Sequence, residues 1–164
     1  VLNGLGADAV PIRRESELNE VDGLVIPGGE SSVMDKLSRT FGLAEPLKAR
    51  IAAGMPVYGT CAGLIMLADT VLDAIAGQQS LGGLDIAVRR NAFGNQLDSF
   101  ETDLVIPGMG EPAFHAVFIR APVVETVGPA AHAVAALHQG LSAMGSVDCR
   151  RQRSHAAARV RQPV

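Results

Sequence analysis

The sequence predicts an α/β fold, a doubly wound and mostly parallel sheet with helices on both faces. A strand, a tight loop and a helix follow one another twice, first from Leu24 and again from Pro56, as in βαβ units. Hydrophobic residues make up 48% of the chain but aromatic residues only 4%. Apolar mass carried by Ala, Val, Leu and Ile suits strands that are buried on both faces. The length of 164 residues matches one domain.

The first elements are expected from short local patterns. Residues 2–6 read as the last turn of a helix, residues 9–12 as a short strand and residues 15–20 as a polar turn. Residues 24–26 are an apolar run that ends at Pro-Gly-Gly, which predicts a buried strand entering a sharp loop.

The later elements follow from helical spacing and from glycine and proline. Ser31 and Ser32 can cap a helix that runs to about Arg39, and a second helix is expected over residues 44–53, before Gly54. A strand at 56–58 leads into a helix from Leu64 to about Leu72. Shorter strands are expected at the three apolar runs 86–88, 104–106 and 117–119.

The C-terminal residues differ from the rest in composition. Residues 141–164 hold five arginines, one acid and no clear periodicity. We therefore expect a domain over residues 1–140 and a disordered, aberrant tail over residues 141–164.

Charge and composition exclude several classes of function. A net charge of -3 gives no reason to expect a nucleic-acid partner. No apolar run approaches the ~20 residues of a membrane span, and no signal peptide opens the chain. Only two cysteines occur, so we expect no disulfide scaffold and we expect a cytoplasmic location.

The run Gly-Thr-Cys-Ala-Gly at residues 59–63 has the shape of a nucleophile elbow centred on Cys61. Glycines on both sides permit a strained turn between strand and helix that exposes the central side chain. Backbone N–H groups of such a turn can hold an oxyanion. A lone cysteine is usually a buried core residue, but the preceding strand, the following helix and both glycines favour a nucleophile here.

Two further segments are candidate ligand contacts. The run Pro-Gly-Gly-Glu-Ser at 27–31 leaves backbone amides open at a helix start, although an ordinary turn capped by Ser31 would explain it as well. Arginines at Arg90 and Arg120 could pair with a ligand carboxylate, although a solvated surface arginine is the commoner case.

A cysteine nucleophile also needs a general base, normally a histidine oriented by a carboxylate. The candidates are His115, His132, His138 and His155. None has an acid two residues on, and none follows a clear strand. His115 is expected in an exposed loop ahead of the strand at 117–119.

Together these segments resemble the glutaminase subunits of pyridoxal 5′-phosphate synthases, a family of class I glutamine amidotransferases. The resemblance covers roughly residues 1–130. Its matching runs lie at residues 20–31 (EVDGLVIPGGES), 57–68 (VYGTCAGLIMLA), 88–101 (VRRNAFGNQLDSFE) and 117–122 (VFIRAP). The first two runs occur in looser form across class I amidotransferases, whereas the last two are much more specific to this family.

The resemblance implies an activity and a set of site residues. Cys61 would attack the side-chain amide of L-glutamine, release ammonia and form a glutamyl thioester that water hydrolyses. The ammonia would pass to a separate synthase subunit that builds pyridoxal 5′-phosphate (vitamin B6). No metal or organic cofactor is implied. The residues implied to contact the glutamine are Gly29, Glu30, Ser31, Arg90, Ile119 and Arg120.

The sequence departs from the family pattern in two places, so the fold is expected to be incomplete at both ends. The family's opening strand and Leu-Gln-Gly loop are absent, and so is the Ser-Phe-His-Pro-Glu run that supplies the catalytic His and Glu. A frameshift or truncation, or a degenerate paralogue, would explain both, and this copy is then expected to be inactive. Alternative functions are a non-catalytic binding partner of the synthase or another class I amidotransferase.

Overall fold

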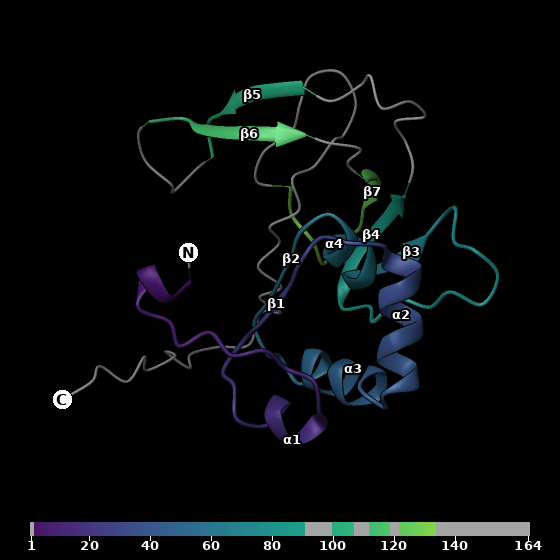
Figure 1. Ribbon diagram of the computed structural model, residues 1–164. Coiled ribbons are helices and arrows are strands. Elements are labelled where there is room, and N and C mark those ends of the chain that lie inside the picture. The colour runs from purple at the N-terminus through teal and green to yellow at the C-terminus, as the bar shows by residue number, and fades with distance from the viewer. Residues whose placement is uncertain (1, 91–99, 107–111, 119–121, 134–164) are drawn as a thin grey trace.

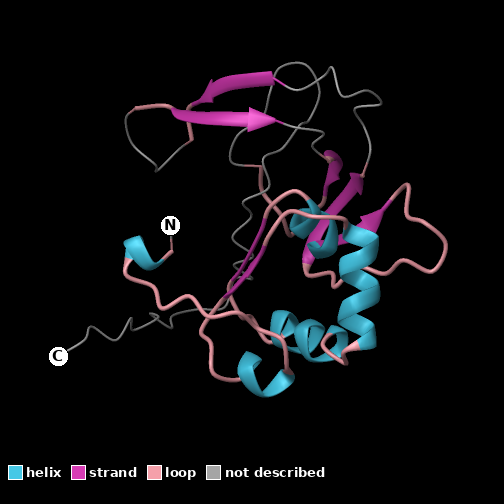
Figure 2. Cartoon of the chain, viewed as in Figure 1, coloured by secondary structure: helices cyan, strands magenta, loops and turns pink. Residues whose placement is uncertain are grey.

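The computed structural model describes residues 2–90, 100–106, 112–118 and 122–133, and their arrangement is shown in Figure 1. Helices and strands are interspersed in the first half of the chain, and strands follow one another in the second half (Figure 2). In chain order the elements are η1 (Asn3–Leu5), α1 (Glu15–Leu18), β1 (Leu24–Ile26), α2 (Ser31–Thr40), α3 (Ala44–Ala52), β2 (Val57–Gly59), α4 (Ala62–Leu67), β3 (Ala68–Val71), β4 (Leu84–Arg89), β5 (Phe100–Leu104), β6 (Phe114–Phe118) and β7 (Val123–Val127).

The described strands form three separate sheets, and the two that lie near the site each contain a parallel pair. β1 pairs with β2 in parallel, with Ile26 opposite Gly59, so both strands end at the same edge. β3 pairs in parallel with β4, and β7 joins the other side of β4 antiparallel. β5 and β6 form a separate antiparallel hairpin. Parallel strands joined through helices agree with the predicted α/β class.

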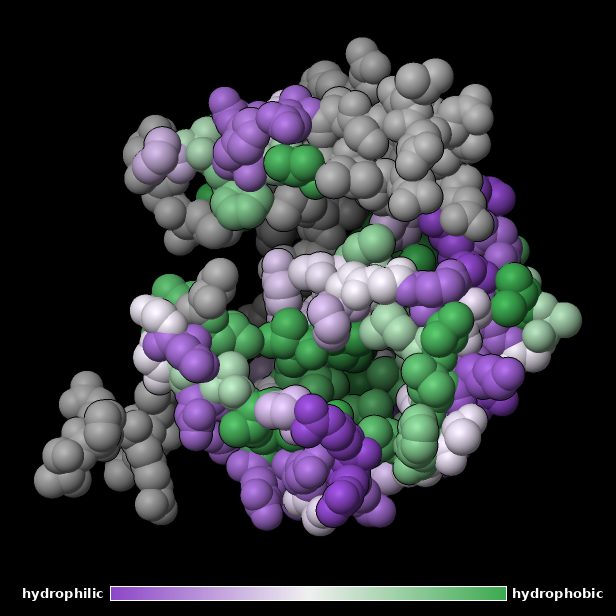
Figure 3. Space-filling model, in the orientation of Figure 1, coloured by the Kyte–Doolittle hydropathy of each residue, from purple (hydrophilic) through white to green (hydrophobic). Residues whose placement is uncertain are grey.

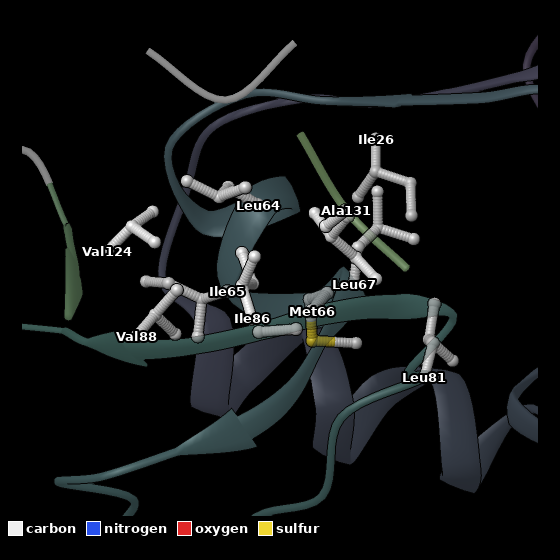
Figure 4. Close-up of a cluster of buried hydrophobic side chains, with 12 residues drawn as sticks. Ile26, Leu64, Ile65, Met66, Leu67, Leu81, Ile86, Val88, Val124 and Ala131 are labelled. Atoms are coloured by element: carbon white, nitrogen blue, oxygen red, sulfur yellow. The ribbon is translucent and has the colours of Figure 1, made fainter. Parts of the chain in front are cut away.

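The hydrophobic core is built around α4. All six residues of this helix are buried. Its side chains meet those of β4 on one side, as Figure 4 shows for Ile65 and Ile86. The buried cluster consists of Ile26, Leu64, Ile65, Met66, Leu67, Ala68, Leu81, Leu84, Ile86, Val88, Val124 and Ala131. A helix without a polar face has to sit inside the fold, and this fixes the residue that precedes it, Cys61.

The outer face of the β1–β2 pair is more open. Val25 and Tyr58, which lie opposite each other, are 42% and 40% exposed. On the face shown in Figure 3, hydrophobic residues gather in a hollow between β1 and α3, and polar residues surround α1. Within the described residues no helix is both long and apolar enough to cross a bilayer.

Several predicted elements are confirmed, with shifted ends. The strands at 24–26 and 56–58 and the helices after residues 31 and 44 are present. The helix expected over residues 64–72 instead ends at Leu67, because residues 68–71 form β3 and pair with β4. The Met66 carbonyl then accepts hydrogen bonds from Leu81 and Gly82, which satisfies the shortened helix end.

Two other expected elements are wrong, one is shifted and one strand was missed. The strand expected at residues 104–106 is β5, which lies earlier in the chain and ends at Leu104. Residues 9–12 form no strand, since Pro11 has no N–H to donate and no described strand lies beside them. Residues 15–18 form the short helix α1 rather than a turn, because the Glu17 carboxylate accepts hydrogen bonds from the N–H groups of Arg13 and Arg14. β7 was not expected. The proposed boundary at 140/141 and the tail lie outside the described residues.

Candidate active site

Cys61 stands in a strained turn between β2 and α4. Its φ of 50° and ψ of -108° make it the only non-glycine residue with positive φ among the described residues. Holding a side chain in this region costs about 1–3 kcal/mol and persists only where surrounding contacts impose it. The cysteine is free and exposed although the residues that follow it are buried. The turn therefore presents the thiol at the surface, as the sequence predicts.

The two glycines beside Cys61 are required by close backbone packing. A β-carbon on Gly59 would lie 2.7 Å from the carbonyl carbon and oxygen of Gly63. A β-carbon on Gly63 would overlap the carbonyl oxygen of Ile26 and lie 2.9 Å from its carbonyl carbon. The first turn of α4 therefore rests directly on the backbones of β1 and β2. This contact fixes the turn that carries the cysteine.

The loop after β1 lies beside the thiol. A β-carbon on Gly28 would be 3.4 Å from Cβ of Cys61 and 4.0 Å from its Sγ. The two loops are also joined by a hydrogen bond of 3.1 Å from the Thr60 N–H to the Ile26 carbonyl. Because β1 and β2 run in parallel, their ends bring the Gly-Gly-Glu-Ser loop and Cys61 to the same edge.

Glu30 is the N-cap of α2, whereas the sequence favours Ser31 or Ser32 for this role. Its Oε1 accepts hydrogen bonds from the backbone N–H and from the hydroxyl of Ser32, at 3.0 and 2.7 Å. These hydrogen bonds, aided by the charge of Arg90, lower the pKa of the Glu30 carboxyl. Glu30 is therefore a carboxylate at neutral pH, and its side chain is 51% exposed.

Arg90 joins this loop from the end of β4. Its Nη2 donates to Oε1 of Glu30 at 2.9 Å, and its Nη1 donates to Oε1 of Gln78 at 2.6 Å. Its backbone N–H donates to Asp73 at 2.6 Å. The Arg90 side chain is only 9% exposed, so it acts on a ligand chiefly by holding the Glu30 carboxylate in place. The structure thus brings Gly29, Glu30, Ser31 and Arg90 into one cluster around the loop beside Cys61.

Of the remaining candidates, the structure describes only His115 and His132. Ile119, Arg120, His138 and His155 lie outside the described residues. His132 is exposed, and no hydrogen bond joins it to Cys61. His115 is exposed as expected, but it lies in strand β6 and not in a loop. Across the hairpin its two ring nitrogens contact Asp103 at 2.9 Å and Glu101 at 3.2 Å, which leaves neither for a cysteine.

We expect His115 to titrate above the ordinary value of 6.5, since hydrogen bonds to Asp103 and then to Glu101 raise its pKa. Because the folded-state pKa is raised, the stability that protonated His115 contributes to the hairpin is fully present below pH 6.5. This contribution is lost as pH rises through the folded-state pKa. NMR titration of the imidazole C–H signals checks this. Asp103→Asn should lower the midpoint more than Glu101→Gln does, and a wild-type midpoint at or below 6.5 would contradict the hairpin contacts.

Two residues of the cluster were missed from the sequence. Gly28, which the sequence analysis placed in the candidate run 27–31 but not among the residues implied to contact glutamine, is the glycine that lies against Cys61; the double glycine after a strand is a signal that could have found it. Gln78 bridges Arg90 and Ser31, and no local pattern marks it, because its partners are 12 and 47 residues away. Within the described ranges, no group of three or more His, Cys, Asp or Glu is arranged to hold a metal ion.

Comparison with known proteins gives a consistent picture. A sequence model of the SNO glutamine amidotransferase family matches residues 2–156. A protein of Leifsonia xyli named pyridoxal 5′-phosphate synthase subunit PdxT is 69% identical over 140 residues, which are 85% of this chain and 71% of that protein. A protein of the same name from Clavibacter sepedonicus is 64% identical over 140 residues, covering 85% of this chain and 67% of that protein.

A solved structure has the same fold. A crystal structure of a glutamine amidotransferase superposes with a TM-score of 0.77 at 40% sequence identity, covering 85% of this chain and 73% of that one. The predicted α/β class is confirmed by this similarity, together with the parallel strand pairs.

Proposed function

The chain belongs to the SNO glutamine amidotransferase family, and from this premise we propose that it hydrolyses L-glutamine to L-glutamate and ammonia through a thioester on Cys61. The ammonia is used by a synthase subunit that makes pyridoxal 5′-phosphate, since the relatives are named as subunits of that synthase. The observation that carries the proposal is the exposed thiol of Cys61 in a positive-φ turn directly beside the Gly28–Ser31 loop.

The proposed chemistry runs in two steps. The Cys61 sulfur, as thiolate, adds to the side-chain amide carbon of glutamine, and backbone N–H groups of the turn stabilise the resulting oxyanion. The carbon–nitrogen bond breaks as the nitrogen gains the proton that the thiol has lost, and ammonia leaves. Water then adds to the thioester carbonyl, the carbon–sulfur bond breaks, and glutamate is released with the thiol restored. Neither step needs a metal or an organic cofactor.

We assign the recognition of glutamine to the loop beside the thiol. The Glu30 carboxylate suits the ammonium group of an amino acid. Among the described residues, every hydrogen bond to this carboxylate ends on Oε1, which leaves Oε2 available to a ligand. Gly29 and Ser31 flank it, and Arg90 holds it from behind. Ile119 and Arg120 complete the pocket by family resemblance. The amidotransferase domain spans residues 1–140 in this proposal, in a cytoplasmic protein whose partners are the synthase and L-glutamine.

A second function has its own support. No hydrogen bond joins Cys61 to a histidine among the described residues, and residues 1–164 contain no Ser-Phe-His-Pro-Glu run. Such a chain would serve as a non-catalytic partner of the synthase. The two functions differ in one respect only, which is whether docking is accompanied by glutamate release.

Glutamate release and docking should therefore be measured together, with the 164-residue chain and a synthase subunit from a relative's organism. We expect docking, and a rate of glutamate release about 10²–10⁴-fold below that of a relative carrying the His and Glu, because a general base contributes that much. Cys61→Ala is the blank for the assay. Release at the relative's rate would contradict the role assigned to the missing base, and docking without any release above the blank would establish the second function.

A further inference from the structure

Gln78 lies between two residues of the proposed glutamine pocket without belonging to the family motifs. We infer that Gln78 is a positioning residue, which sets Ser31 and Arg90 in place for glutamine binding through paired hydrogen bonds from its side-chain amide. The inference rests on the proposed function, because the pocket it serves is the one assigned above.

Both ends of the Gln78 amide are engaged by pocket residues. Its Oε1 accepts a hydrogen bond of 2.6 Å from Nη1 of Arg90, and its Nε2 donates one of 3.1 Å to Oγ of Ser31. Ser31 is 2% exposed and the Arg90 side chain 9%. Because both partners are buried, the loss of either hydrogen bond would leave a polar group unsatisfied, which costs free energy. One amide therefore fixes the start of α2 and the guanidinium at the end of β4 relative to each other.

Arg90 in turn orients the Glu30 carboxylate, to which it is hydrogen-bonded. Of its three guanidinium nitrogens, Nη1 contacts Gln78, Nη2 contacts Glu30 at 2.9 Å, and Nε is buried without a hydrogen-bond partner among the described residues. The guanidinium has two hydrogen-bond partners among the described residues, so losing the one at Gln78 would leave it free to turn about its contact with Glu30. The carboxylate that faces the ligand would then lose its fixed orientation.

The loop that carries Gln78 is itself clamped onto α2 from outside the pocket. Nη2 of Arg39 donates to the Gly77 carbonyl at 3.2 Å, and the Gln79 N–H donates to Oδ2 of Asp35 at 3.0 Å. Asp35 is 3% exposed. Burial alone would raise the pKa of Asp35, but hydrogen bonds from Arg39 and from the Gln79 N–H outweigh it and lower the pKa. The loop is thus anchored to α2 independently of the Gln78 side chain.

The test compares two neighbouring glutamines in the full chain docked on the synthase. Gln78→Met removes the hydrogen bonds to Ser31 and Arg90, and a weaker one of 3.4 Å from the Ile75 N–H, at similar volume. Gln79→Met is the matched control, because the exposed Gln79 side chain makes one hydrogen bond among the described residues, from Nζ of Lys48 at 3.5 Å. The dissociation constant for L-glutamine is measured by calorimetry. We expect Gln78→Met to weaken binding roughly tenfold, since it removes a hydrogen bond to a charged group, and Gln79→Met to leave binding unchanged.

A third variant separates positioning from folding. Gln78→Glu keeps an acceptor for Arg90 but loses the donor to Ser31, so it should recover part of the affinity, while the melting temperatures of all variants stay close. If the wild type binds L-glutamine, and both Gln78→Met and Gln78→Glu bind it with the wild-type affinity, the inference is overturned and the proposed function stands. If the wild type itself does not bind L-glutamine, the proposed function is overturned, and the inference with it.

Discussion

Cys61→Ala is expected to abolish covalent labelling of the chain by a chloroketone analogue of glutamine. The reagent needs a nucleophile at the position of the scissile amide and a pocket that recognises the amino-acid head group. Cys61 supplies the first in an exposed turn, and the Gly28–Ser31 loop beside it supplies the second. Because the reagent brings its own leaving group, labelling does not depend on a histidine. Intact-protein mass spectrometry gives the result directly, with one adduct expected on the wild type and none on the variant.

The second cysteine provides the control for this experiment. Cys149→Ala keeps one thiol, Cys61, and should be labelled at the wild-type rate. Excess L-glutamine should slow labelling of the wild type, whereas excess L-alanine should not. An adduct that persists in Cys61→Ala, or one that disappears in Cys149→Ala, would show that Cys61 is not the reactive residue.

Gly63→Ala should cost about 3 kcal/mol or more of the free energy of unfolding, because the added methyl meets rigid backbone. It would overlap the carbonyl oxygen of Ile26 and lie 3.1 Å from the Ile26 Cβ, so relief requires separating α4 from β1. Six consecutive buried residues of α4 move with it. Urea unfolding followed by circular dichroism measures the loss.

Gly4→Ala is the matched control for this substitution. A β-carbon on Gly4 has nothing within 4 Å, so its replacement should change the free energy of unfolding by less than about 0.5 kcal/mol. Equal stability of the Gly63→Ala and Gly4→Ala variants would contradict the close packing of α4 on β1, and with it the explanation of why the residue after Cys61 and Ala62 has to be glycine.

The strand–loop–helix units could be predicted from the sequence because their signals are local. Three apolar residues before a Pro-Gly-Gly run and a glycine on each side of a cysteine each favour one backbone conformation. The end of α4 could not be predicted in the same way. Residues 68–71 are compatible with helix or strand, and the pairing of Ala68 with Leu84 decides between them, a contact that no local pattern contains.

The residues of the site likewise divide into those with a local sequence signal and those placed by contacts between distant residues. Cys61 and the loop at 28–31 are recognisable from glycine spacing and from family resemblance. The cap of α2 was misassigned because serine is the commoner cap, whereas Glu30 both caps the helix and binds Arg90. Gln78 could not be found, since a polar residue in a loop looks like any other until the fold sets it against Ser31 and Arg90.

The most direct test of a single glutamine site at Cys61 is a crystal structure of the chain with L-glutamine bound. We expect the side-chain amide carbon within about 3.5 Å of the Cys61 sulfur, a near-attack distance, and the amino-acid head group hydrogen-bonded to the loop at residues 29–31. Glutamine bound away from Cys61, or an empty pocket at saturating glutamine, would contradict the claim that the thiol and this loop form a single glutamine site.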